Sequence, residues 1–208
     1  MRRLFLQKFV ADIKSSFAFY LSLAFFFFAG ISAGAFTMLP YYEGGNLKIF
    51  LTGVINTISN NGINVLNSLA GALINNAIWL FLIFISGIGI FLLPCLYVTM
   101  LLEGFTFGIA ASAFIGNFGF GGVIVVILCI LPPSWLIAIC HAKMSKIALQ
   151  NALFRYRNRK TPAGAGMTRE YLIRLSGMAI ISALVMLLQA IAFPYLFQWL
   201  TKVILPLS

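Results

Sequence analysis

The charged residues of this 208-residue chain are gathered into two short stretches that lie far apart in the sequence. Between these clusters the chain carries only three charged residues, Glu43, Lys48 and Glu103. So long a stretch with so little charge cannot form the surface of a water-soluble domain, and this limits the fold before any motif is considered. Twelve of the fourteen basic residues form the clusters: Arg2, Arg3, Lys8 and Lys14 in the first, and Lys143, Lys146, Arg155, Arg157, Arg159, Lys160, Arg169 and Arg174 in the second.

The composition is that of a protein whose main solvent is lipid. Hydrophobic residues make up 62% of the sequence, charged residues make up 9%, and the mean hydropathy is +1.02. A soluble domain carries about 25% charged residues. We therefore predict an all-α fold, a polytopic integral membrane helical bundle that forms a single domain over residues 1–208.

The net charge of +10 fits both nucleic-acid-binding proteins and membrane proteins with basic cytoplasmic loops. No groove-reading or base-stacking motif accompanies the basic residues. The clusters instead flank apolar runs, where membrane proteins carry their excess of Lys and Arg. We expect membrane lipids with anionic headgroups, and no nucleic acid, as partners of these residues.

Five apolar runs are long enough to cross the hydrocarbon layer, which takes about 20 residues of helix. Residues 1–16 and 40–71 instead alternate apolar and polar residues at helical spacing, which predicts amphipathic helices at the membrane surface. The basic segment 143–174 is expected to continue as helix to about Arg157, before a linker rich in Pro and Gly. The predicted spans are 17–39, 72–93, 97–115, 123–142 and 175–201.

The basic clusters also orient the predicted spans. With the first cluster in the cytoplasm, five crossings place the turn 94–96 and the basic segment 143–174 inside. Residues 40–71, the Gly-rich loop 116–122 and the C-terminus then lie outside. The predicted topology is N-in and C-out, with both clusters on the cytoplasmic side.

Two other arrangements fit part of this pattern. The basic start, the apolar run and the small residues Ala33-Gly34-Ala35 are also typical of a cleaved signal peptide. Against cleavage, the leading region is long and the apolar run continues past the triplet. A sixth span would have to come from residues 46–71, which are rich in asparagine and too polar to cross.

Glu103 is the one charged residue inside a predicted span. A carboxylate at the centre of a membrane helix costs about 2.5–3.5 kcal/mol on insertion scales, so it should face the bundle interior, water or a partner, or be protonated. Two interpretations are open: a route for ions or protons, and a structural hydrogen bond to a neighbouring helix or a water-filled vestibule. Glu103 is therefore the candidate intramembrane polar site.

No pattern in the sequence points to an enzyme, a cofactor or a metal. His141 ends a predicted span beside Lys143, where the helix dipole favours a cation. Cys95, Cys129 and Cys140 lie in or beside apolar runs without metal-ligand spacing, which is typical of small buried residues. A catalytic centre needs several convergent groups, and none is visible. We predict a non-enzymatic protein with no catalytic, cofactor-binding or metal-binding residues.

Two pairs of glycines match the small-xxx-small pattern of closely packed membrane helices: Gly30 with Gly34, and Gly104 with Gly108. These four glycines are candidate helix-packing residues. The same pattern is also compatible with a homo-oligomer.

Pro132 and Pro133 remove two amide donors within the fourth predicted span, which makes them a candidate helix break. The break is expected to give either a bend that shapes the bundle or a binding surface.

One order of motifs runs through nearly the whole chain. A basic N-terminal helix and a first span precede the long outer segment and a hairpin with Pro94 at its turn. The run Leu101-Leu102-Glu103-Gly104-Phe105-Thr106-Phe107-Gly108, the Gly-rich loop and Leu131-Pro132-Pro133 then follow. This order resembles the stage II sporulation protein M family.

The resemblance implies a multi-pass protein of the bacterial cell membrane that acts as a non-catalytic scaffold. Members of that family recruit the peptidoglycan-degrading stage II sporulation proteins D and P to the sporulation septum, where hydrolysis drives engulfment of the forespore. The residue before Gly104 need not be acidic in the family, so the resemblance implies no role for Glu103.

The sequence thus leaves two functional hypotheses. The first is the scaffold, with its partners recognised by residues 40–71 and by the third and fourth spans. The second is a small membrane transporter or permease subunit that uses Glu103. A scaffold should be insensitive to Glu103→Gln, whereas a transporter should lose its flux.

Overall fold

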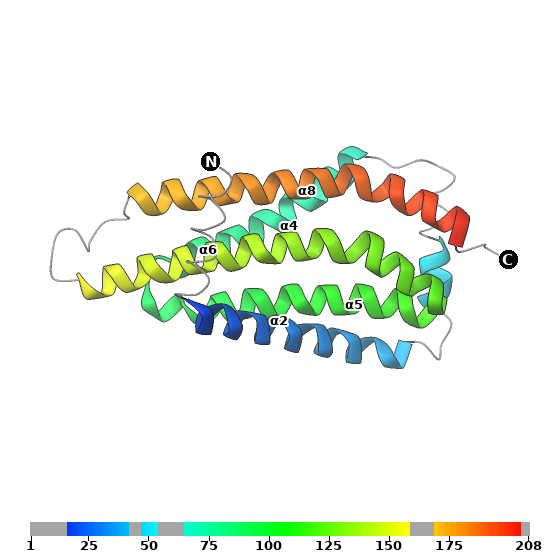
Figure 1. The fold of residues 1–208 in the computed structure, drawn as a ribbon, viewed down its shortest axis with the longest axis horizontal. Helices are drawn as coiled ribbons and strands as arrows, with labels where there is room; N and C mark the ends of the chain where they lie inside the picture. The colour runs from blue at the N-terminus through cyan, green and yellow to red at the C-terminus, as the bar shows by residue number, and fades with distance from the viewer. Residues whose placement is uncertain (1–15, 42–46, 54–64, 159–168, 205–208) are drawn as a thin grey trace.

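The computed structural model describes residues 16–41, 47–53, 65–158 and 169–204, and every element within them is helical (Figure 1). This confirms the predicted all-α fold. Most of residues 1–16, the middle of the predicted amphipathic segment 40–71 and the linker 159–168 lie outside the described residues. The elements are α2 (Phe17–Met38), η1 (Leu39–Tyr41), α4 (Val65–Ser86), η2 (Ile90–Leu92), α5 (Pro94–Val125), η3 (Val126–Ile130), α6 (Leu131–Arg157) and α8 (Arg169–Ile204).

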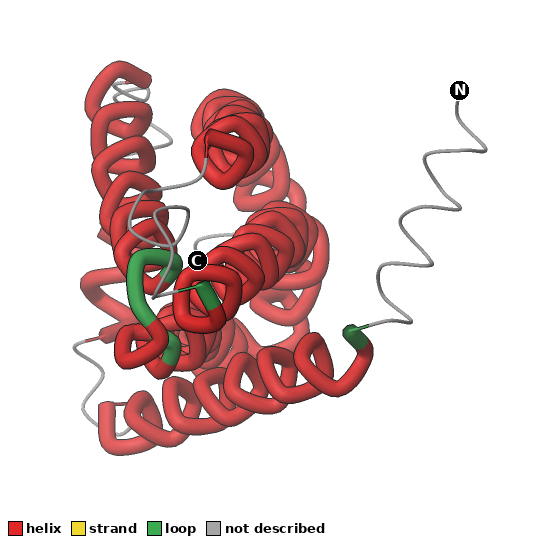
Figure 2. The backbone as a smooth tube through the Cα atoms, turned by 90° about the vertical axis from the view of Figure 1, so that its left-hand side faces the viewer, coloured by secondary structure: helices red, strands yellow, loops and turns green. Residues whose placement is uncertain are grey.

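The five long helices pack into one bundle, in which α5, α6 and α8 run roughly along the long axis and α4 crosses them obliquely (Figures 1 and 2). Helix α2 packs against α5 on one side of the bundle, and α8 packs against α6 and α4 on the other. Helices α2, α5 and α8 run in one direction, and α4 and α6 run in the opposite direction (Figure 1). Helices α4, α5, α6 and α8 therefore surround the middle of the bundle.

The contact between α2 and α5 depends on four glycines. A Cβ atom added to Gly30 or Gly34 of α2 would overlap the carbonyl oxygen of Leu101 or Phe105 on α5. A Cβ atom added to Gly104 or Gly108 of α5 would in turn overlap a carbonyl oxygen of α2. The two backbones approach each other so closely that no larger residue fits, which is how small residues hold membrane helices together. The structure thus brings all four candidate helix-packing residues into one interface.

A single glycine, Gly119, turns the chain back on itself within α5. Gly119 has φ 55° and ψ −127°, and no other described residue has a positive φ. The helices before and after it lie antiparallel (Figure 1), and a Cβ atom on Gly122 would overlap the carbonyl oxygen of Phe114. The predicted loop 116–122 is therefore a helical turn with one non-helical residue. Glycine adopts this backbone conformation readily because it has no Cβ atom.

The candidate helix break lies at a change of helix type. A π-helical turn, η3, covers Val126–Ile130, and Pro132 and Pro133 fall in the first turn of α6. Proline has no amide hydrogen to donate to the preceding turn, so the regular α-helical bonding is interrupted at these two residues, and the turn before them is π-helical. The chain stays helical on both sides of the prolines, so the expected break takes the form of a π-helical turn.

Helix α4 begins and ends earlier than the predicted span 72–93. The turn after it is fixed by two side chains from other helices. The Tyr171 hydroxyl donates to the carbonyl of Phe84 at 3.0 Å, and the Asn151 amide donates to the carbonyl of Gly87 at 2.9 Å. These bonds satisfy carbonyls that the end of a helix leaves without partners. The sequence remains apolar through Leu93, so composition alone gives no sign of this turn.

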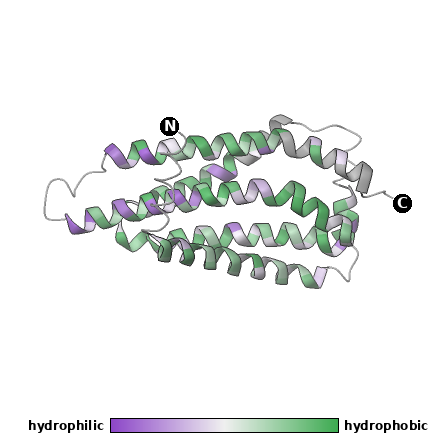
Figure 3. Cartoon of the chain, viewed as in Figure 1, coloured by the Kyte–Doolittle hydropathy of each residue, from purple (hydrophilic) through white to green (hydrophobic). Residues whose placement is uncertain are grey.

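The hydropathy of the helices fits a membrane location. Among the described residues, three helical stretches are long and apolar enough to cross a membrane, namely Phe17–Tyr41, Ile90–Arg157 and Arg169–Ile191, and Leu73–Ser86 is a shorter apolar helix. Large apolar side chains remain exposed along the bundle, and the hydrophilic residues gather toward the end where α6 finishes and α8 starts (Figure 3). Helix α6 continues to Arg157, which confirms the predicted helical extension of the fourth span.

We predict that Gly104→Ala will lower the stability of the bundle by about 1–3 kcal/mol, because the added methyl group must push α2 away from α5. The measurement is the free energy of unfolding in mixed detergent micelles. Gly177→Ala is the matched control, since a Cβ atom at this helical glycine meets nothing within 4 Å. Equal effects of the two substitutions would contradict the proposed role of the glycine interface.

Candidate functional site

Four helices each contribute one polar side chain to a buried network at the centre of the bundle. Asn76 comes from α4, Glu103 from α5, His141 from α6 and Ser182 from α8. The Nδ1 atom of His141 contacts the Oε1 atom of Glu103 in an ion pair or hydrogen bond. On the other side of the ring, Nε2 lies 3.3 Å from the Asn76 Oδ1 atom and 3.5 Å from the Ser182 Oγ atom. The Ser182 hydroxyl donates to Asn76 Oδ1 at 3.0 Å.

The network leaves little of its polar surface exposed. His141 and Ser182 are fully buried, Asn76 is nearly so, and 10% of the Glu103 side chain remains exposed. A lone carboxylate at this position would carry the full cost of desolvation. Beside an imidazole, the pair has no net charge whether the proton lies on Glu103 or on His141, and the surrounding hydrogen bonds offset part of the remaining cost.

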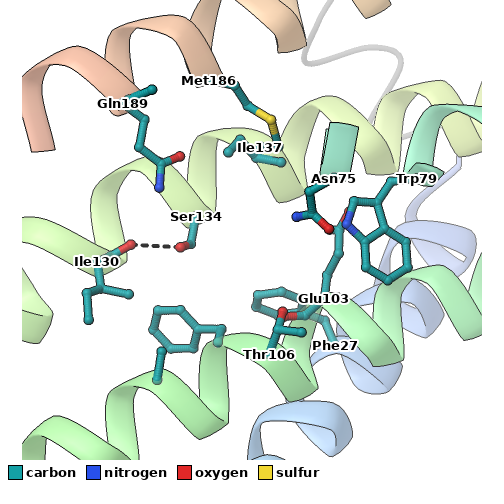
Figure 4. A pocket seen from close by; sticks show the side chains of 13 residues that line it. Phe27, Asn75, Trp79, Glu103, Thr106, Ile130, Ser134, Ile137, Met186 and Gln189 are labelled. Atoms are coloured by element: carbon teal, nitrogen blue, oxygen red, sulfur yellow. Dashed lines mark hydrogen bonds between the residues drawn. The ribbon is translucent and has the colours of Figure 1, made fainter. Parts of the chain in front are cut away.

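Glu103 is the member of the network that reaches an open space. A cavity of about 390 Å³ lies beside it among α2, α4, α5, α6 and α8, and it is lined by several amide and hydroxyl groups (Figure 4). This volume lies within the range of sites for small molecules. The polar residues of the lining are Asn75, Trp79, Glu103, Thr106, Ser134 and Gln189.

The hydroxyl groups of the cavity are held by their own helices. The Ser134 hydroxyl donates to the carbonyl of Ile130 at 2.7 Å, and the Thr106 hydroxyl donates to the carbonyl of Glu103 at 2.9 Å. Each hydroxyl oxygen keeps lone pairs that accept hydrogen bonds from a bound solute. The side chains of Asn75 and Gln189 lie on the border of the same space and supply both donors and acceptors (Figure 4). The cavity therefore suits a small polar solute.

The arrangement can store and move one proton. A carboxylate and an imidazole in contact share a proton, and the carboxylate also borders the cavity. Within the part of the chain that the structure describes, no group of three His, Cys, Asp or Glu residues comes together to hold a metal ion. Proton exchange and hydrogen bonding to a solute are thus the chemistry that these residues offer.

His141 is where the structure departs most from the sequence prediction. The sequence predicts a position at the end of the fourth span, where the helix dipole favours a cation. It lies instead inside α6, because this helix continues to Arg157, and its ring is buried against Glu103. The sequence contains one sign of this pair. Within the predicted spans, Glu103 is the one acidic residue and His141 the one basic residue. Asn76 and Ser182 gave no such signal.

The other candidate residues lie outside the network. Gly104 follows Glu103 but belongs to the face of α5 that contacts α2. Pro132 and Pro133 line a mainly apolar groove between α6 and α8. Two of the three cysteines, Cys129 and Cys140, are buried, and all three have free thiols.

Comparison of the chain with known protein families, with curated proteins and with solved structures finds no match.

We predict that the substitutions Glu103→Met and His141→Leu will each destabilise the bundle by about 3–5 kcal/mol, because each leaves one buried polar partner without the other. The double variant should be more stable than either single variant, since it removes both groups. Free energies of unfolding in detergent give the coupling energy of the pair. Strictly additive effects would show that the two side chains do not interact.

Proposed function

We propose that the chain is a multi-pass membrane protein in which α2, α4, α5, α6 and α8 each cross the bilayer once. The stretch Ile90–Arg157 counts as one apolar unit by composition, but it folds back on itself at Gly119. The parts on either side are both longer than the roughly 20 residues that a crossing needs. Helix α4 contains 22 residues, or about 33 Å of helix, which is close to the thickness of the hydrocarbon layer.

The proposed orientation follows from the ends of the helices. The last turn of α6 carries Arg155 and Arg157, and the first two turns of α8 carry Arg169 and Arg174. They lie at the same end of the bundle as the start of α2 (Figure 1), which follows the first basic cluster in the sequence. The positive-inside rule supports a cytoplasmic position for this end, with the N-terminus inside and the C-terminus outside.

We infer that the protein works as a proton-linked permease subunit for a small polar solute. The single observation that supports this function is the buried Glu103–His141 pair at the edge of a polar cavity. Ionisable residues within membrane helices are rare and costly, and they commonly mark the routes of protons, ions or substrates. Glu103 takes a proton from the cavity or from His141, and the amide and hydroxyl groups of the lining hold the solute.

We predict that Glu103→Gln will abolish proton uptake into proteoliposomes. The vesicles enclose a pH-sensitive dye, and a mixture of amino acids, sugars and polyamines is added outside them. Uptake is driven by a potassium diffusion potential. The glutamine amide preserves the shape of the side chain but cannot release a proton. Glu170→Gln is the matched control, because Glu170 is exposed and pairs with Arg174 outside the network. Uptake no faster than in empty liposomes, or uptake that survives Glu103→Gln, would contradict the permease.

A second function, the membrane scaffold, is supported by a different observation. The run Leu101–Gly108, on which the resemblance to stage II sporulation protein M depends, supplies Gly104 and Gly108 to the contact between α2 and α5. This motif thus has a structural use that needs no substrate. A scaffold in the bacterial cell membrane would present its exposed apolar helices and its outer segment 40–71 to the stage II sporulation proteins D and P.

For the scaffold, we predict that replacing residues 46–64, which precede α4, with an unrelated polar sequence will strongly reduce co-purification of proteins D and P from an endospore-forming host. Glu103→Gln should leave their recovery unchanged, because this residue lies inside the bundle. Both variants are compared with the intact protein at equal expression. Unchanged recovery after the replacement would reject the outer segment as the binding surface.

A further inference from the structure

The cavity beside Glu103 presents one sign of charge to a solute. Among the described residues that border it, Glu103 alone has an ionisable side chain. His141 is fully buried and does not border the cavity, so a bound solute meets the carboxylate and not the imidazole. A cation is therefore the solute that gains most from electrostatic attraction at this position.

The hydroxyl groups of the lining offer a solute acceptors rather than donors. The Ser134 and Thr106 hydroxyls each donate their one hydrogen to a carbonyl of their own helix, at 2.7 and 2.9 Å. Each keeps lone pairs for a solute, and an ionised Glu103 carboxylate also accepts hydrogen bonds only. These three side chains favour a solute with N–H or O–H donors, whereas the amides of Asn75 and Gln189 both donate and accept.

The rest of the lining suits the apolar body of a small cation. The aromatic rings of Phe27, Trp79 and Phe107 border the same space. The face of an aromatic ring attracts a cation, and the indole of tryptophan does so most strongly. The remaining lining residues are apolar and not aromatic: Ala110, Ile130, Ile137, Met186 and Ala190. A few polar groups among apolar ones are typical of sites for small molecules.

The cavity lies on the outer side of the buried pair in the proposed topology. Its lining residues follow Glu103 along α5 and Ser182 along α8, and those of η3 and α6 precede His141. Helices α5 and α8 start at the end of the bundle that carries the basic residues, and α6 finishes there (Figure 1). The cavity is therefore placed to receive a solute from outside, and a membrane potential that is negative inside draws a cation inward.

We propose that the solute of this cavity is a small primary ammonium cation. Its charged group lies against the Glu103 carboxylate and the Thr106 hydroxyl oxygen, which are one turn apart on α5, and its hydrocarbon body lies among the aromatic rings. An ammonium group has three N–H donors and no acceptor, which matches a carboxylate and two hydroxyl oxygens. The proposal rests on the proposed permease, because it names the solute of that permease, but binding can be measured without transport.

Three probes of nearly equal size test the charge of the solute: butylammonium, 1-butanol and butyrate. Binding of radiolabelled butylamine, which carries its proton at neutral pH, is measured by scintillation proximity on the whole protein in detergent micelles. Micelles without protein give the background. We expect saturable binding, with 1-butanol and butyrate each competing at least about tenfold less well than unlabelled butylamine, because hydrogen bonds to charged groups are the stronger ones.

Thr106→Val should weaken the binding of butylamine by about threefold to tenfold, because it removes the acceptor oxygen and keeps the shape of the side chain. This variant leaves Glu103 and His141 in place, so its effect does not come from loss of the buried pair. Thr37→Val is the matched control and should leave binding unchanged. The Thr37 hydroxyl makes the same kind of bond on α2, to the carbonyl of Gly34 at 2.7 Å, and does not line the cavity.

Competition by 1-butanol or butyrate that equals that of butylamine would overturn the ammonium site. So would the absence of saturable binding, or equal effects of Thr106→Val and Thr37→Val. The permease can fail separately from the site. Selective binding of butylamine without proton uptake into proteoliposomes would reject transport and leave the ammonium site intact, whereas proton uptake without selective binding would reject the ammonium solute and leave the permease intact.

Discussion

The pairing of Glu103 with His141 is the interaction on which the centre of this bundle depends. Either group in its ionised form is costly alone among apolar helices, whereas a pair that holds one shared proton has no net charge. Asn76 and Ser182 complete the contacts of the imidazole ring, so α4, α5, α6 and α8 are tied together at one level. Each of these four helices supplies one member, so the network constrains how each of the four is rotated about its own axis.

The contact between α2 and α5 works by a different principle. Four glycines let the two backbones approach closely, so its specificity comes mainly from shape, and the Ser112 hydroxyl adds a hydrogen bond to the carbonyl of Ala35 at 3.5 Å. Different faces of α5 therefore have different neighbours. Gly104 faces α2, whereas its neighbour Glu103 reaches the polar network, so a single step along the sequence changes the environment from apolar packing to proton chemistry.

The cavity beside Glu103 shares one wall with an apolar groove between α2 and α6. Phe27 is buried and belongs to both linings. On one side of this ring lie Glu103 and the amides of the cavity, and on the other lies Trp135. The two linings therefore differ in chemistry: the first includes hydrogen-bonding side chains, and the second is almost wholly apolar.

The sequence by itself determined the fold class, the apolar stretches and the glycines that allow close packing, because hydropathy, charge and the absence of a side chain are properties of a residue that need no partner. It also marked Glu103 as an exception. Only the tertiary structure decided that His141 is its partner, that Asn76 and Ser182 join them, that one glycine replaces the predicted loop 116–122, and that α4 ends before Leu93. These features depend on how far each helix is rotated and shifted against its neighbours, and long apolar runs leave that rotation undetermined, because almost every face of such a helix is equally hydrophobic.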